Sequence, residues 1–238
     1  TGSRPRRPAD VPFDKERVLD ATSVLQMRRL PRRMTIIGGG VIACEFATIF
    51  APLGVAVSLV DSHDHLLAYL DEDIQQTLEH DLLDMGVQLH MQTRIKQIER
   101  QGERVQLETD SGINLETDIV LYALGREPNY DSLELAAAGI DADDHGWVRI
   151  NEHHQTSRDH IYIIGDLAGR PSLASTAMEQ GRLAMNNLKV PQIFSKQRRA
   201  LRYVRAVKRH RSVDAASWLE DDITADFLDR VDFMNLPY

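Results

Sequence analysis

After its first 33 residues, the chain's pattern of hydrophobic and polar positions predicts a strand, a glycine-rich turn, a helix and a second strand in succession. A short apolar run at 34–37 predicts a strand, and the segment after the turn has apolar residues at helical spacing until Pro52-Leu53-Gly54 ends it. Alternating residues then predict a second strand over 55–60. The face of the helix expected to enter the core consists of Val41, Ile42, Phe46, Ile49, Phe50 and Leu53.

A second helix is predicted over 71–84, before Gly86 stops it. Its expected apolar face consists of Ile74, Leu78, Leu82 and Met85. From 87 to 115 the chain changes to short alternating segments separated by turns, which predict an antiparallel meander with strands at 87–91, 95–98 and 105–108. A buried strand at 118–123, a short strand at 160–164 and a helix over about 172–187 complete the pattern, which indicates an α/β fold.

The first 33 residues lack such periodicity. They are rich in arginine and proline, which predicts a connector, with the compact unit beginning at Met34.

The glycine-rich turn between the first strand and helix has the sequence Gly38-Gly39-Gly40-Val41-Ile42-Ala43-Cys44-Glu45. The first glycine permits a tight turn, the third lets the backbone approach a pyrophosphate, and Ala43 lets the helix pack closely on the strand. The second strand ends at Asp61, where a dinucleotide-binding unit needs an acid to accept hydrogen bonds from the adenosine ribose. The sequence therefore predicts nicotinamide dinucleotide binding.

Composition excludes several other classes. The chain has 238 residues, of which 42% are hydrophobic, yet no apolar run is long enough to cross a bilayer and no signal peptide is recognisable, so a cytoplasmic protein is expected. The net charge of −8 argues against general nucleic-acid binding. The single cysteine, Cys44, excludes a disulfide within this chain, and its place in the helix favours a packed side chain.

Histidines and paired acids do not form a recognisable metal or catalytic motif. His153-His154 with His160, and His63-Asp64-His65, lack the spacing of a closed zinc site, so no metal is expected. Asp143-Asp144 and Glu220-Asp221-Asp222 are interpreted as solvated surface acids.

The last fifty residues are interpreted as a helical tail over 189–238. A basic block at 196–211 precedes an acidic segment at 214–232, and the two are interpreted as solvated helices of opposite charge. Apolar residues recur every four positions at Leu219, Ile223, Phe227 and Val231, after a capping motif at Ser217. This helix face is expected either to cover apolar area left by missing domains or to belong to unrelated sequence joined to the chain.

Four motifs in fixed order give the chain, over roughly 1–188, a resemblance to a known family. It resembles the flavoproteins with two dinucleotide-binding domains, the family of glutathione reductase, lipoamide dehydrogenase and soluble pyridine nucleotide transhydrogenase. The motifs are Thr1-Gly2-Ser3-Arg4-Pro5, the glycine-rich turn from Gly38 to Glu45, Leu124-Gly125-Arg126-Glu127-Pro128-Asn129, and Ile161-Tyr162-Ile163-Ile164-Gly165-Asp166.

The resemblance implies a domain organisation and a set of cofactor contacts. Residues 30–129 would form the NAD(P)-binding domain, 1–29 a connector from the FAD domain, and 130–188 the C-terminal part of an incomplete FAD-binding domain. The residues implied to contact NAD(P) are Gly38, Gly39, Gly40, Val41, Ile42, Ala43, Glu45, Asp61, Ser62 and Gly125, with Glu45 beside the nicotinamide ribose. Arg126, Gly165 and Asp166 would lie on the FAD side, although Arg126 could equally anchor neighbouring acids.

The activity that the resemblance implies is hydride transfer between a nicotinamide and FAD. Within the family, the stretches 60–67 and 171–175 look most like the soluble transhydrogenases, with a disulfide reductase or lipoamide dehydrogenase as the close rival and a non-catalytic nicotinamide-binding fragment as the alternative. Full-length relatives are expected to be homodimers. Asp61 favours NAD, whereas His63 and His65 leave NADP as the second candidate.

Overall fold

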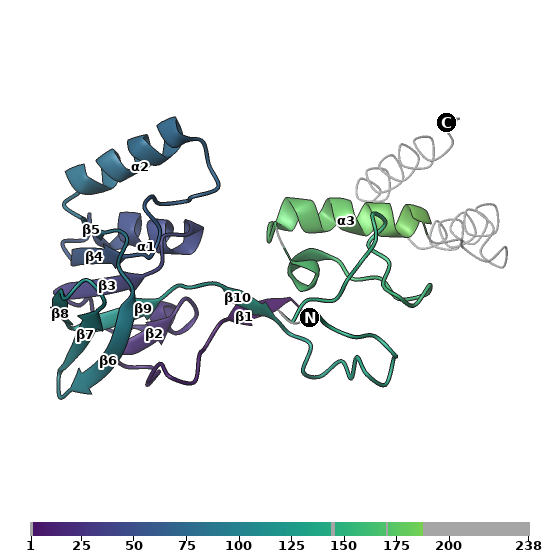
Figure 1. Ribbon diagram of the computed structural model, residues 1–238, viewed down its shortest axis with the longest axis horizontal. Helices are drawn as coiled ribbons and strands as arrows, with labels where there is room; N and C mark the ends of the chain where they lie inside the picture. The colour runs from purple at the N-terminus through teal and green to yellow at the C-terminus, as the bar shows by residue number, and fades with distance from the viewer. Residues whose placement is uncertain (1, 144–145, 170, 188–238) are drawn as a thin grey trace, which may run out of the picture. The chain divides into compact units, whose positions relative to one another are not determined.

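The computed structural model describes residues 2–143, 146–169 and 171–187 (Figure 1). The predicted tail over 189–238, with its basic and acidic blocks and its apolar series, lies outside the described residues, as do Thr1 and Asp144.

A parallel sheet of five strands organises the first part of the chain. Its spatial order is β2-β9-β3-β4-β5, and every pairing is parallel. The bounds are β2 Val18–Asp20, β9 Ile119–Tyr122, β3 Arg33–Ile37, β4 Ala56–Val60 and β5 Gln88–His90. Two helices, α1 (Val41–Phe50) and α2 (Glu72–Asp84), connect successive strands, as parallel pairing requires.

Helices cover one face of this sheet, and a three-stranded antiparallel sheet covers the other (Figure 1). Met34 and Ile36 of β3 pack in a cluster with Ala43, Ala47 and other residues of the helices. The alternate residue Ile37 packs instead with Val105 and Leu107 of a three-stranded antiparallel sheet. Both faces are therefore buried, which explains the nearly continuous apolar run in β3. The α/β fold with an antiparallel meander is confirmed.

The meander comprises β6 (Ile95–Gln101), β7 (Arg104–Thr109) and β8 (Asn114–Thr117). The prediction that the strand at 87–91 joins the meander is wrong, because β5 pairs in parallel with β4. Alternation shows that a segment is extended, but the partner strand is decided by the crossover through α2, which the local pattern does not reveal.

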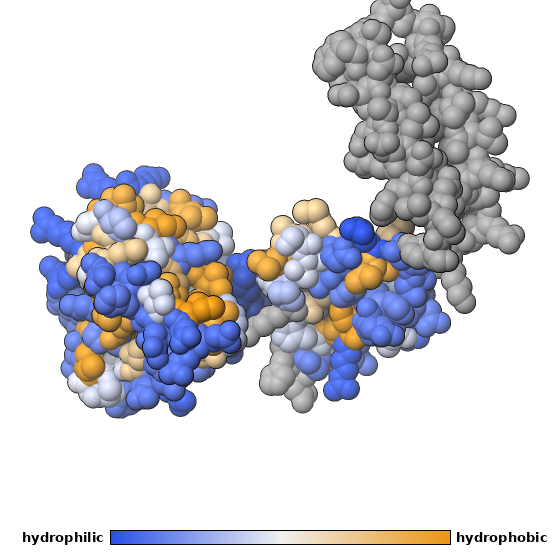
Figure 2. All heavy atoms as spheres, turned by 90° about the horizontal axis from the view of Figure 1, so that it is seen from above, coloured by the Kyte–Doolittle hydropathy of each residue, from blue (hydrophilic) through white to orange (hydrophobic). Residues whose placement is uncertain are grey.

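The expected apolar face of the first helix is also partly wrong. Val41, Ile49 and Leu53 are 47%, 51% and 56% exposed. The small side chains of Ala43 and Ala47 face the sheet instead, fully buried, since a helix that approaches a strand closely cannot place large residues between them. Figure 2 shows apolar residues interspersed with hydrophilic ones on the visible surface.

The second helix buries a narrower stripe than predicted. Leu82 is fully buried, but Ile74 and Met85 are 53% and 45% exposed. Gln75, on the same helix, is buried instead. A buried amide needs a hydrogen-bond partner, and that of Gln75 donates to the loop carbonyl of Leu70 at 2.7 Å.

The N-terminal region contains structure that periodicity missed. The prediction that the compact unit begins at Met34 is wrong, because β2 forms one edge of the parallel sheet and Val18, Leu19 and Asp20 are all buried. Three residues are too few for a period to be recognised.

The later part of the described chain has little regular structure apart from one long helix. β1 (Ser3–Pro5) pairs antiparallel with β10 (Arg126–Pro128). The strand predicted at 160–164 is wrong, since Tyr162 forms only an isolated bridge with Gln155 and the short 3-10 helix η2 (Gly165–Ala168) follows. A small core of Ile140, Val148, Ile163 and Leu167 holds this region together. The predicted last helix is confirmed as α3, Ala174–Asn187.

Asp20 fixes the end of β2. Its carboxylate, 1% exposed, accepts hydrogen bonds from the backbone N–H groups of Thr22 and Ser23, at 2.9 and 2.7 Å, and pairs with Arg7. Burial alone would raise the Asp20 pKa, but the hydrogen bonds from Ser23, Arg7 and Thr22 outweigh it and hold the pKa below its usual value.

Replacing this carboxylate is expected to destabilise the fold. Asp20→Asn should lower the free energy of unfolding by about 1–3 kcal/mol at pH 7, because the amide leaves Arg7 without its anion. The carboxylate's contribution is present above the unfolded-state pKa, about 3.9, and is lost as pH falls through the lower folded-state pKa, so the difference between the proteins should shrink only in acid. Urea unfolding across pH measures both effects.

The matched control is Glu103→Gln, which removes an 84% exposed carboxylate paired with Arg17. A surface ion pair of this kind contributes about 0–1 kcal/mol. If the two variants unfolded alike, the buried network at Asp20 would have no special role in stability.

Candidate dinucleotide site

The glycine-rich turn is held between the ends of three strands. Gly38 has φ +120°, and its N–H donates to the carbonyl of Val60 at 2.8 Å. A Cβ at this position would lie 3.0 Å from the carbonyl oxygen of Ala123, just after β9. Both the backbone conformation and the contact with backbone therefore require glycine here.

Gly40 serves a different purpose, because the space beside it is open. It is exposed, has φ −84°, and an added Cβ would meet nothing within 4 Å. It begins α1, whose Cys44 N–H donates to the Gly40 carbonyl at 3.1 Å. The helix has no side-chain cap and no acid in its first turn, so its first N–H groups and the positive end of its dipole are available to an anion.

Asp61 packs against the middle glycine of the turn. A Cβ on Gly39 would lie 3.0 Å from the Asp61 Cγ and 3.1 Å from a methyl carbon of Leu66. Asp61 is 4% exposed, and its Oδ1 accepts the backbone N–H of His63 at 2.8 Å and contacts the His63 Nδ1 at 2.6 Å. The predicted ribose acid is thus placed beside the predicted pyrophosphate turn.

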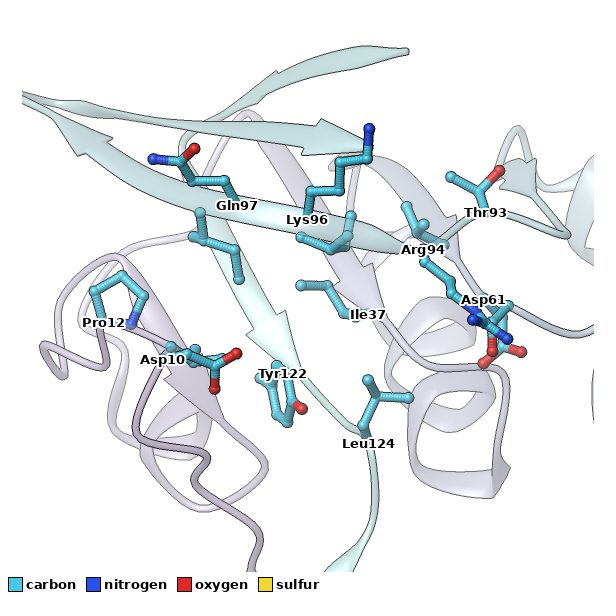
Figure 3. Close-up of a pocket in the computed structure, with 15 residues that line it drawn as sticks. Asp10, Pro12, Ile37, Asp61, Thr93, Arg94, Lys96, Gln97, Tyr122 and Leu124 are labelled. Carbon is cyan, nitrogen blue, oxygen red and sulfur yellow. The ribbon is translucent and has the colours of Figure 1, made fainter. Parts of the chain in front are cut away.

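A cavity of about 490 Å³ opens at the carboxyl ends of β3, β4 and β9 (Figure 3). Of the predicted site residues, Asp61 and Ser62 line it, and the glycines do not. Its other lining residues include several that sequence analysis missed, namely Asp10, Thr93, Arg94, Lys96 and Tyr122. The available signal was positional, since Thr93 and Arg94 follow β5 just as Asp61 follows β4.

The other residues of the predicted fingerprint lie on the first turns of α1. Val41 is exposed, Ile42 is half-buried and Ala43 is fully buried against the sheet. Glu45 is exposed on the surface of the helix, outside the cavity. Gly125, with φ +90°, is exposed and also lies outside the cavity.

The residues predicted for the FAD side are joined by one serine. Arg126 donates through Nε to the Ser3 hydroxyl and through Nη2 to the Ser3 carbonyl, both at 2.7 Å. The Ser3 hydroxyl in turn donates to Oδ2 of Asp166 at 2.7 Å. Gly165, with φ +66°, donates its N–H to the side chain of Gln180 at 2.7 Å. Arg126 thus anchors a serine of β1, and through it an acid 40 residues ahead in sequence, rather than an adjacent acid.

Cys44 is a packed residue, as expected. It is 5% exposed, and burial, together with the charge of Asp61, raises the pKa of its thiol to about 11. A thiol in this setting is predominantly protonated at neutral pH and reacts slowly.

Thiol labelling tests this assignment. A thiol pKa of about 11 corresponds to a thiolate fraction on the order of a hundredfold below that of a free cysteine, so native Cys44 should react with a thiol reagent far more slowly than the urea-unfolded chain. Equal rates in the two states would show that Cys44 is accessible and ionised. N-acetylcysteine in the same urea concentration controls for the reagent.

Neither a metal site nor a membrane span is found in the part of the chain that the structure describes. Its histidines, cysteine and acids form no group of three suited to hold a metal ion. Among the same residues, every helix is too short or too polar to cross a membrane.

The parallel sheet, the glycine turn and the strand-end acid together define a dinucleotide-binding α/β protein. The family model of the pyridine nucleotide-disulphide oxidoreductases matches residues 1–181. The chain belongs to the pyridine nucleotide-disulphide oxidoreductase family, and the resemblance seen in its motifs is confirmed.

Curated relatives include soluble pyridine nucleotide transhydrogenases. That of Vibrio vulnificus strain YJ016 is 41% identical over 182 residues, which are 76% of this chain and 39% of the relative. That of Escherichia coli O81 strain ED1a is 41% identical over 187 residues, covering 79% and 40%. The chain therefore spans about two-fifths of the length of these relatives.

Solved structures agree on the fold. LpdA from Mycobacterium tuberculosis superposes with a TM-score of 0.73 at 33% identity, over 78% of this chain and 40% of that one. The HOCl-induced flavoprotein disulfide reductase RclA from Escherichia coli gives a TM-score of 0.73 at 28% identity, over 79% of this chain and 43% of that one.

Proposed function

We propose that this chain supplies the nicotinamide-dinucleotide site of a flavin-dependent oxidoreductase of the soluble transhydrogenase type. The observation that carries the proposal is the open space at Gly40 beside an uncapped helix N-terminus, with Asp61 at the next strand end. The names of the relatives supply the reaction class.

The roles of individual residues follow from this arrangement. Gly38 holds the turn, Gly40 admits the pyrophosphate to the N–H groups of Val41, Ile42 and Ala43, and Gly39 lets Asp61 pack beside the turn. The second oxygen of Asp61, Oδ2, accepts no hydrogen bond from a described residue and is assigned to the adenosine ribose, next to Ser62. Glu45 and Gly125 are assigned to the nicotinamide side.

The proposed domain organisation follows the motifs and is amended by β2. Residues 30–129 form the NAD(P)-binding domain, with β2 of the preceding 1–29 segment completing its sheet. Residues 130–188 are assigned to the C-terminal part of the FAD-binding domain, and 189–238 lie outside the described residues. A cytoplasmic homodimer that does not bind nucleic acid is proposed for the complete protein.

Asp166 and Gly165 are assigned to FAD. FAD would supply an acceptor for the hydride of NAD(P)H. Asp166 suits this role because the Ser3 hydroxyl orients its carboxylate at 2.7 Å while Arg126 holds Ser3. The chain's own task is to hold the nicotinamide dinucleotide and FAD in a fixed relative orientation.

The competing assignment is lipoamide dehydrogenase or disulfide reductase activity, since the similar protein RclA is a disulfide reductase.

Nicotinamide binding is tested by filling the space at Gly40. Gly40→Ala should lower the unfolding free energy by no more than about 1 kcal/mol, since its Cβ would meet nothing within 4 Å and only the preference of the α1 N-cap for glycine over alanine is lost. It should lower NADH affinity by about tenfold or more, equal to about 1.4 kcal/mol, because a methyl group then stands where the pyrophosphate must approach. Fluorescence titration with NADH measures the affinity.

The matched control is Gly181→Ala in α3, where the added Cβ would make an ordinary contact at 3.4 Å with Ile164. This variant should bind NADH like the unsubstituted chain. Unchanged NADH binding by Gly40→Ala would contradict the proposed pyrophosphate position, and an unsubstituted chain that binds no dinucleotide would contradict the proposed function.

Flavin participation requires a separate measurement. When FAD is added to the chain without oxygen, NADH is expected to bleach the visible absorbance of the oxidised flavin faster than in protein-free solution. Asp166→Ala should weaken FAD binding and leave NADH affinity unchanged. Tight NADH binding with no protein-dependent bleaching would identify a nicotinamide-binding module instead.

A further inference from the structure

The dinucleotide cavity contains an arginine that the family motifs do not account for. Other arginines on or beside the three-stranded sheet pair with acids: Arg100 with Asp14 and Glu16 at 2.7 and 2.9 Å, and Arg104 with Glu116. In contrast, the guanidinium of Arg94 has no hydrogen-bond or ion-pair partner among the described residues, although it lines the cavity and is exposed. A cation that faces a cavity without an acid partner is suited to bind an anion there.

The backbone at Arg94 is fixed to the end of β4. The N–H of Thr93 donates to the carbonyl of Asp61 at 2.8 Å, and the N–H of Gln92 donates to the carbonyl of His63 at 2.8 Å. The N–H of Arg94 itself donates to Oδ1 of Asp110 at 2.8 Å. These bonds fix the backbone of Arg94 close to Asp61, the proposed ribose acid. Only the arginine side chain remains to be ordered by a ligand.

The direction of the side chain agrees with this placement. In Figure 3 Arg94 extends from its loop towards the end of β4, where Asp61 lies, whereas Lys96 extends in the opposite direction. Both residues line the same cavity, so they provide cations of equal charge and different orientation.

His63 and His65, in the loop after β4, are the other candidates for binding a phosphate. Both imidazoles already have acid partners. His63 Nδ1 contacts Asp61 Oδ1 at 2.6 Å, and His65 Nδ1 lies 3.3 Å from Oε1 of Glu79. Asp61 itself is 4% exposed, and its Oδ1 is already bonded to His63. These facts leave Arg94 as the cation best placed to attract a phosphate near the adenosine ribose.

We propose that Arg94, in the loop after β5, binds the 2′-phosphate of NADP(H) and so determines how tightly this site holds the phosphorylated dinucleotide. This inference rests on the proposed function, because it needs the adenosine ribose at Asp61. A planar guanidinium gives a phosphate two parallel hydrogen bonds, and the ribose of NADH has no group that requires them.

The test compares NADH, NADPH and adenosine 2′,5′-bisphosphate on the full chain and three variants. Arg94→Gln should weaken NADPH and the bisphosphate by about 10- to 50-fold, the expected range for a charge-assisted bidentate contact, and change NADH affinity by less than about twofold. Arg94→Lys should restore part of the NADPH affinity because it retains the charge but not the fork. Isothermal titration calorimetry provides the dissociation constants.

Lys96→Gln is the matched control, since it removes one positive charge two residues away. It should reduce NADPH affinity by less than about threefold, an effect of general charge that added salt removes. Thermal unfolding of each Arg94 variant should match the unsubstituted chain, because the exposed guanidinium has no hydrogen-bond or ion-pair partner among the described residues.

Two results would overturn the inference, and each differs from a failure of the proposed function. An equal loss of NADH and NADPH in Arg94→Gln would place the arginine on a shared group such as the pyrophosphate. An unchanged NADPH affinity would remove Arg94 from the site. If the unsubstituted chain bound neither dinucleotide, the proposed function itself would fail and the inference with it.

Discussion

The site depends on the close approach of three chain segments at one point, the turn after β3. Gly38 lies against the backbone of Ala123 after β9, and Gly39 lies against Asp61 at the end of β4. A side chain at either glycine would push a neighbouring segment away, since both contacts are 3.0 Å from an ideal Cβ. The glycines therefore set the spacing of β9, β3 and β4, and that spacing brings the strand-end acid to the turn that is proposed to hold a pyrophosphate.

This constraint extends into the neighbouring loops through backbone hydrogen bonds. Asp61 donates its N–H to the carbonyl of His90 at 3.1 Å and accepts from Thr93 at 2.8 Å. The loop after β5 is consequently fixed to the end of β4, even though it has no regular secondary structure. A cavity wall made by such a loop has a defined position relative to Asp61, which is what a site needs if it is to distinguish ligands that differ by one group.

Sequence predicted the parts of this structure that depend on local chemistry. It predicted the glycine turn, the acid Asp61 and the helix α3. Turn conformation, the end of a strand and helical period all depend on residues that are consecutive in the chain. The parallel pairing of β5, the buried strand β2 and the cavity position of Arg94 were not predicted, because each depends on a partner far away in sequence. The core face of α1 was mispredicted for the same reason. Ala43 and Ala47 face the sheet because the helix and the sheet lie close together, which favours small side chains over the most hydrophobic ones.

The Ser3 hydroxyl shows how an acid can be oriented without being neutralised. If Arg126 contacted Asp166 directly, the pair would satisfy each other's charge and the carboxylate would have little attraction left for a ligand. Instead Ser3 accepts from Arg126 and donates to Oδ2 of Asp166, both at 2.7 Å. The guanidinium polarises the hydroxyl, the hydroxyl fixes one carboxylate oxygen, and the other oxygen accepts no bond from a described residue. An acid held in this way can accept hydrogen bonds from a bound ligand, which suits the assignment of Asp166 to FAD.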